Sequence, residues 1–159
     1  MALIVEDGTG VAGADSYLSV ADADAHHADR GNAGWTGDVA AKEAALRKAT
    51  DYLGQVYRLR WLGARVDDGQ ALDWPRTGFD AIGSDVVPGE VRRAAAELAL
   101  MALGADLNPP LERGGRVTRE KVGPIETEFA DGAPGRTRYP AIDGLLAPLL
   151  ARPGRLARV

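Results

Sequence analysis

Apolar residues recur at helical spacing in two segments of the first third of the chain. The first segment runs from Ser19, a helix-capping residue type, to about Arg30, and Gly31 provides a stop. The second follows Asp38 and continues to Tyr57, with apolar residues three and four positions apart and charged residues facing away. We therefore predict one amphipathic helix in each segment.

Two further helices are predicted in the second half of the chain. Residues 89–103 follow Pro88, which suits a helix start, and apolar side chains cover more than half of the circumference. We expect this helix to be central, with its alanines letting neighbouring backbones approach closely. Residues 140–151 form a shorter apolar pattern, which Pro148 should kink or divide into two pieces.

The period-two pattern typical of strands is found in two places. Residues 116–122 and 125–129 predict a hairpin around Gly123-Pro124, in which apolar residues alternate with glutamates along the second strand. Leu3–Val5 is a short strand candidate. The stretch 62–85 is irregular and rich in glycine, and a loop of more than ~15 residues in a compact domain usually has side chains that pin it. The expected pins are Leu72, Trp74 and Phe79.

Together these elements predict a mainly α fold. We expect a small helical bundle of about four helices, with a β-hairpin and an extended C-terminal tail. Residues 1–151 should form a single domain, and residues 152–159 a flexible basic tail.

Composition narrows the class of protein. The chain of 159 residues is long enough for one ordinary domain, and it contains no cysteine, which excludes disulfides, thiolate nucleophiles and cysteine-ligated zinc. No apolar run reaches the ~18 residues needed to span a membrane, and the N-terminal residues lack the features of a secretory leader. We expect neither membrane insertion nor export by that route.

Charge is distributed unevenly. Residues 1–45 hold eight acidic residues against two basic ones, a net −6, whereas the whole chain carries −4. The basic residues of the remainder gather towards its end: Arg113, Arg116, Arg119, Lys121, Arg136, Arg138, Arg152, Arg155 and Arg158. An acidic front and a basic rear can meet head to tail in a ring, although both can also be solvated faces without a partner.

Two motifs suggest ligands, and both have a simpler interpretation. Residues 8–13 satisfy GxGxxG after a strand candidate, but the expected helix does not open inside the motif, and Glu6 and Asp7 would repel a pyrophosphate. His26 and His27 are the only histidines; Asp22 has i, i+4 spacing with His26, but two ligands on an exposed helix make a weak metal site. We predict no cofactor and no metal, and solvated or capping histidines.

Catalytic chemistry has little support. Serine occurs only beside turn or cap signals, so no nucleophilic triad can be argued, and the paired glutamates of the hairpin are explained by a wet strand face. Trp74-Pro75-Arg76 allows two interpretations. Trp74 is either a core residue with Arg76 pairing locally, or both contact another subunit, as tryptophan and arginine often do at interface centres.

Several segments, taken in order, resemble tailed-phage head–tail connector proteins. One of them is Gln70-Ala-Leu-Asp-Trp-Pro-Arg-Thr-Gly78, and it is the order of all the segments together that is specific. The other segments are Ala14–Ala25, Lys42–Leu53, Val91–Leu100, Lys121–Phe129 and Tyr139–Leu150, so the likeness covers about residues 1–150. Many such sequences carry the description of a DnaT-like single-stranded-DNA-binding protein.

The resemblance implies a structural adaptor and no enzyme. Such subunits form a ring, usually of twelve, that joins the portal to a stopper or tail-terminator protein in the virion neck, after assembly in the host cytoplasm. DNA passes through the ring without sequence-specific binding. In related adaptors an extended C-terminal segment docks onto the portal. The candidate contact residues are accordingly Trp74, Arg76, Arg152, Arg155, Leu156, Arg158 and Val159.

A second interpretation is a single-stranded-DNA-binding replication accessory protein. It would use the basic residues between Arg113 and Lys121, with Phe129 and Tyr139 for stacking. An aromatic content of 6% and a negative net charge give this interpretation little compositional support.

Overall fold

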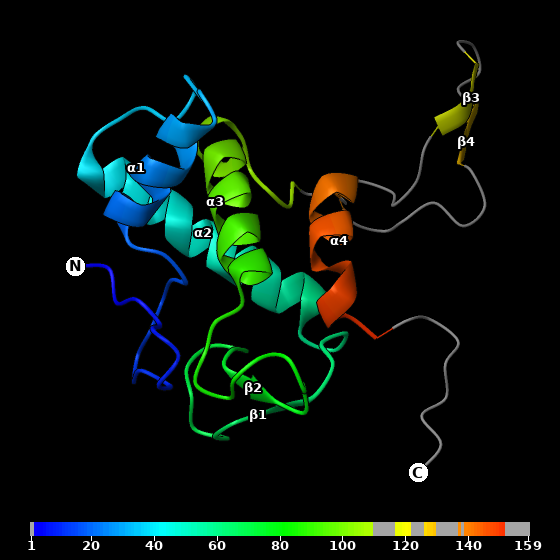
Figure 1. Cartoon of the computed structure of the whole chain (residues 1–159). Helices are drawn as coiled ribbons and strands as arrows, with labels where there is room; N and C mark the ends of the chain where they lie inside the picture. Colours follow the sequence, from blue (N-terminus) through cyan, green and yellow to red (C-terminus); the bar gives the residue numbers. More distant parts are fainter. Residues whose placement is uncertain (1, 110–116, 122–125, 130–136, 138, 152–159) are drawn as a thin grey trace.

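The computed structural model describes residues 2–109, 117–121, 126–129, 137 and 139–151. It confirms a mainly α domain with a β-hairpin (Figure 1). The helices of the described residues are α1 (Val20–Asp29), α2 (Val39–Tyr57), α3 (Gly89–Gly104) and α4 (Pro140–Leu146), with a 3-10 turn, η1 (Ala147–Leu149). The strands are β1 (Ala64–Arg65), β2 (Arg76–Thr77), β3 (Val117–Lys121) and β4 (Glu126–Phe129). None of these helices is both long and apolar enough to cross a membrane.

The helix ends follow the predicted signals. The Ser19 hydroxyl accepts a hydrogen bond from the backbone N–H of Asp22, and the Asp38 carboxylate accepts one from that of Ala41, so both caps satisfy otherwise free donors of the first turn. At the other end of the chain α4 stops at Leu146, and Pro148 lies in the 3-10 turn that follows. The expected division of this segment by proline is confirmed.

Helix α3 is the centre of the molecule, as predicted. It packs chiefly on α2, and on α1 and α4 as well (Figure 1). Its buried residues are Val91, Ala94, Ala95, Ala96, Leu98, Ala99 and Ala102. Because alanine side chains are short, the helix axes can approach closely along this face, and the burial extends around most of the helix.

The irregular stretch is pinned by aromatic packing, again as predicted. Trp74 is 0% exposed, and its ring lies 5.7 Å from that of Trp61 and 5.3 Å from that of Phe79, centroid to centroid. The sequence did not reveal the short ladder that pairs Ala64 with Thr77. Gly63 makes this pairing possible, since its φ is +68° and a Cβ there would lie 1.9 Å from the carbonyl oxygen of Thr77.

The predicted strand at Leu3–Val5 is wrong. Only a single parallel bridge joins Val5 to Ser16, and the Ile4 carbonyl accepts from the backbone N–H groups of Asp15 and Ser16. The chain loops round between Val5 and Ser16 and returns in the same direction, so that one bridge forms and no ladder. The β3–β4 hairpin is confirmed as an antiparallel pair with an irregularity between Val117 and Arg119. The predicted C-terminal tail, residues 152–159, lies outside the described residues.

Candidate functional site

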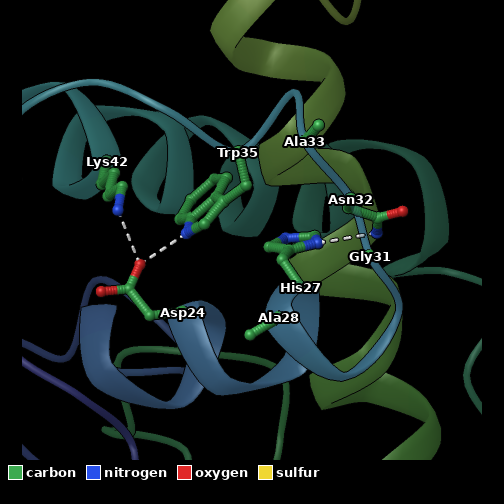
Figure 2. A pocket seen from close by; sticks show the side chains of 8 residues that line it. All are labelled: Asp24, His27, Ala28, Gly31, Asn32, Ala33, Trp35 and Lys42. Carbon is green, nitrogen blue, oxygen red and sulfur yellow. Dashed lines mark hydrogen bonds and ion pairs between the residues drawn. The ribbon is translucent and has the colours of Figure 1, made fainter.

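An open hollow of about 450 Å³ lies between α1, the following loop and the start of α2 (Figure 2). At one side the Asp24 carboxylate accepts hydrogen bonds from the Trp35 indole Nε1 at 2.6 Å and from the Lys42 ammonium at 2.8 Å. The bond from Lys42 is the main reason why the pKa of Asp24 is lowered. Lys42 also lies 5.5 Å from the centre of the Trp35 ring. These contacts tie the first turn of α2 to α1.

His27, on the other side of the hollow, is held at both ring nitrogens. Its Nε2 lies 3.2 Å from the carbonyl oxygen of Ala96 on α3, so this nitrogen donates. Its Nδ1 accepts from the Asn32 side-chain amide at 3.0 Å (Figure 2). His27 is 1% exposed, and burial is the main cause that lowers its pKa. The prediction of a solvated or capping histidine is therefore wrong for His27, because the α1–α3 contact encloses it.

The Nε2 of the neighbouring His26 lies 2.8 Å from the Oε1 of Glu97 on α3, and the carboxylate accepts a hydrogen bond from it. His26, His27 and Glu97 each offer one ligand atom, and these atoms lie within 4.8 Å of one another. The donor set does not fit zinc, however, since the Nε2 of His27 carries the proton it donates and the Nδ1 lone pair accepts from Asn32. Two ligands would remain, where protein zinc sites use three or four. This cluster fastens α1 to α3.

The glycine-rich loop 8–13 is arranged unlike a dinucleotide-binding turn. The backbone N–H groups of Gly8 and Gly10 both donate to the Oε1 of Glu6, each at 2.9 Å. Glu6 is 2% exposed, so the chain's own carboxylate fills the anion-binding concavity that the glycines create. A phosphate would have to displace this buried anion. Gly8 is also needed for packing, because a Cβ there would lie 2.0 Å from the carbonyl oxygen of Asp85.

Trp74 and Arg76 both lie inside the subunit, which supports the core interpretation of this pair. The Arg76 guanidinium donates to the carbonyl oxygens of Leu62, Gly63 and Asp73. Burial is the main cause that lowers the pKa of Arg76. Neither residue presents a contact surface in this arrangement. The other candidate contact residues, Arg152, Arg155, Leu156, Arg158 and Val159, lie outside the described residues.

Sequence reasoning missed the apolar surface. Large aliphatic side chains are exposed at Ile4, Val39, Leu59, Leu62, Val66 and Val86. By contrast, the aromatic rings whose exposure the structure describes are buried or partly buried. Leu59 is 97% exposed, just beyond the end of α2 between Arg58 and Arg60. The only signal in the sequence was a leucine placed between two arginines where the helical period stops.

Besides the exposed aliphatic side chains, the apolar surface contains a groove of about 750 Å³. It runs between the loop before α3, the first turn of α3 and the turn η1, and we call it the α3–α4 groove. Its lining residues are Phe79, Asp80, Ala81, Ile82, Gly83, Val86, Pro88, Gly89, Glu90, Pro148 and Leu149. The lining is thus mainly apolar, with two carboxylates and no basic side chain. It escaped the sequence reasoning because its two halves lie some sixty positions apart in the chain.

A family model with the description "Putative DnaT-like ssDNA binding protein" matches residues 1–159. The chain matches no curated protein and no solved structure. The match spans the helices, the glycine-rich loop, the α3–α4 groove and the C-terminal residues alike.

Proposed function

We propose that this chain, which belongs to the DnaT-like ssDNA-binding family, is a structural adaptor in the neck of a tailed phage. Copies of the subunit form a ring that joins the portal to the next neck or tail protein and surrounds the path of the DNA. The resemblance of the chain to head–tail connector proteins suggests this role. The exposed aliphatic side chains and the apolar groove of the described surface support it.

The proposal rests on the kind of side chain that is exposed on the described surface. Exposed aliphatic residues and an apolar groove suit contacts between proteins. Single-stranded DNA binding uses a cationic groove with aromatic rings on which bases stack. In the described helices, most basic side chains are instead paired with carboxylates, as in Arg47 with Asp15, Arg92 with Asp22 and Lys42 with Asp24.

The same ion pairs bear on the acidic front of the chain. Asp15 and Asp22 belong to the segment with net −6, yet their partners Arg47 and Arg92 come from α2 and α3 of the same subunit. Part of that acidity is thus neutralised internally. We still expect the inner wall of the ring to be neutral or acidic, because tight binding of phosphates would impede the passage of DNA. A lumen lined with arginine would contradict this expectation.

Imaging of neck complexes tests the proposal. The chain is expressed together with the portal protein of the same phage, purified through a tag on the portal, and imaged in negative stain. We expect a ring of this chain at the portal. Finding it as a lone monomer, attached neither to the portal nor to the tail, would overturn the proposal.

The C-terminal residues are the proposed portal contact. Residues 152–159 follow the last described residue in the sequence and include three arginines. A segment that becomes ordered on binding can cover a large surface of its partner. A chain that ends at Ala151 should fail to co-purify with the portal; unchanged co-purification would refute this contact.

The family description favours a second candidate function, single-stranded-DNA binding. It would depend on the basic residues between Arg113 and Lys121; Arg113 and Arg116 lie outside the described residues, whereas Arg119 and Lys121 lie in β3. A gel-shift titration with an oligonucleotide at several salt concentrations separates the two functions. Micromolar binding at physiological salt, weakening steeply as salt rises, would favour this candidate over the adaptor.

A further inference from the structure

Leu59 and the α3–α4 groove are complementary in both apolarity and charge. Leu59 is 97% exposed, and it stands between Arg58 and Arg60, whose side chains are 62% and 38% exposed. Each arginine is already placed by an ion pair, Arg58 with Asp73 at 3.0 Å and Arg60 with Asp143 at 3.3 Å. The result is an apolar tip with a cation on either side, held at the end of α2.

The groove presents the opposite arrangement. Its floor and walls are apolar, with Val86 44% exposed and Ile82 and Phe79 partly buried against the core. Asp80 and Glu90 are the charged residues of its lining, and Glu90 is partly exposed although it also lies 3.5 Å from the Arg93 guanidinium. Leu59 is not part of that lining, so a subunit can use its tip and its groove at the same time.

We propose that Leu59 of one copy inserts into the α3–α4 groove of the next copy, with Arg58 and Arg60 facing Asp80 and Glu90. The occupant is a second copy of this chain, since one chain carries both halves of the contact. An interface between two different patches is heterologous, and repetition of it generates a closed ring or an open filament. This inference rests on the proposed adaptor function and assigns the contact between neighbouring subunits of its ring.

The absence of cysteine from the sequence makes crosslinking a direct test. Leu59→Cys and Val86→Cys chains are mixed in complexes with the portal and treated with a mild oxidant. A disulfide requires Cβ atoms roughly 3.5–4.5 Å apart, so it forms only where the two positions meet. We expect the mixed Leu59–Val86 dimer to exceed both homodimers. Val39→Cys replaces Leu59→Cys in the control, because Val39 is also apolar and 62% exposed; this pair should not crosslink.

A charge substitution gives the second measurement. Leu59→Glu puts a carboxylate opposite Asp80 and Glu90, and the substitution should leave folding intact because the side chain is almost fully exposed. We expect self-association in analytical ultracentrifugation to weaken by about tenfold to a hundredfold, as the lost burial of one leucine implies. Val39→Glu is the matched control and should leave self-association unchanged.

The outcomes separate this inference from the proposed function. If Leu59→Glu self-associates as strongly as Val39→Glu, or if Val86→Cys crosslinks to Val39→Cys as well as to Leu59→Cys, the inference is overturned and the adaptor role is left standing. If neck complexes hold the unsubstituted chain only as a monomer, the inference and the proposed function both fail.

Discussion

Arg76 is a buried cation that binds backbone carbonyl oxygens. Its Nε lies 2.8 Å from the oxygen of Leu62, and one terminal nitrogen lies 2.7 Å from that of Gly63. The other terminal nitrogen lies 3.2 Å from the oxygen of Asp73. The planar guanidinium thus joins the start of the irregular stretch to the turn that contains Trp74. A flexible ammonium has no fixed fork with which to reach all three oxygens.

We therefore expect Arg76→Lys to destabilise the protein although the charge is kept. The loss of these three hydrogen bonds from a buried guanidinium should lower the free energy of unfolding by about 2–4 kcal/mol. The measurement is urea denaturation followed by tryptophan fluorescence, which reports on the buried Trp35, Trp61 and Trp74 together. Arg93→Lys is the control; this side chain is 48% exposed and should change the free energy of unfolding by less than about 0.5 kcal/mol. If the two substitutions lower the free energy of unfolding equally, the hydrogen bonds of Arg76 to the three carbonyl oxygens do not stabilise the fold as proposed.

His27 should make the stability of the protein depend on pH. Burial lowers its pKa below the ordinary value of 6.5, with smaller contributions from His26 and Arg30, whereas Glu97 opposes the shift. The folded state then binds fewer protons than the unfolded state. The neutral His27 therefore contributes fully to the free energy of unfolding at a pH above the pKa of the unfolded state. This contribution is lost as the pH falls from about 6.5 towards the lower pKa that His27 has in the folded state.

The check is a series of urea midpoints between about pH 7.5 and about pH 5. The midpoint of the unsubstituted protein should fall with pH, and that of His27→Gln should fall less, because glutamine has no proton to gain. His26→Gln retains His27 and should retain its part of the pH dependence. If His27→Gln and the unsubstituted protein lose stability in parallel, the buried neutral imidazole is not the origin of the effect.

At the scale of elements, the packing around α3 depends on small side chains. Ala95 is 0% exposed at the centre of α3, so extra methylene groups there have no space to enter. We expect Ala95→Leu to lower the free energy of unfolding by about 1–3 kcal/mol, which urea denaturation would measure. Ala44→Leu makes the same change on the exposed face of α2 and should stay within about 0.5 kcal/mol. A tolerated Ala95→Leu would mean that the helices are less closely packed than described.

The elements that were predicted correctly are those that local sequence determines. Ser19 and Asp38 cap helices through bonds to residues three positions away, and Pro148 acts on its own turn. Leu3–Val5 failed because a strand needs a partner, and its neighbours could not be read from the sequence. The environment of His27 was missed for the same reason: Ala96, whose carbonyl fixes the tautomer, lies 69 positions away in the chain.

At the scale of the whole molecule, the last helix completes a core that begins near the N-terminus. Ile142, Leu146, Leu149 and Leu150 are all buried, and the backbone N–H of Ala151 donates to the carbonyl oxygen of Arg60 at 2.7 Å. An antiparallel bridge also joins Leu150 to Trp61. The segment after α2 and the segment after α4 therefore hold each other in place, although about ninety positions separate them in the chain.

Two truncations follow from this arrangement. A chain that ends at Ala151 retains every described contact and should melt at the temperature of the full chain, as measured by circular dichroism. A chain that ends at Thr137 loses α4, and burial of each large apolar side chain contributes about 1.5–3 kcal/mol against a total stability of about 5–15 kcal/mol. We expect this shorter chain not to fold.

A lower melting temperature for the chain ending at Ala151 would place residues 152–159 within the fold itself. If the temperature is unchanged, a loss of portal binding in the same chain can be assigned to the missing contact, because the domain that carries the α3–α4 groove is intact.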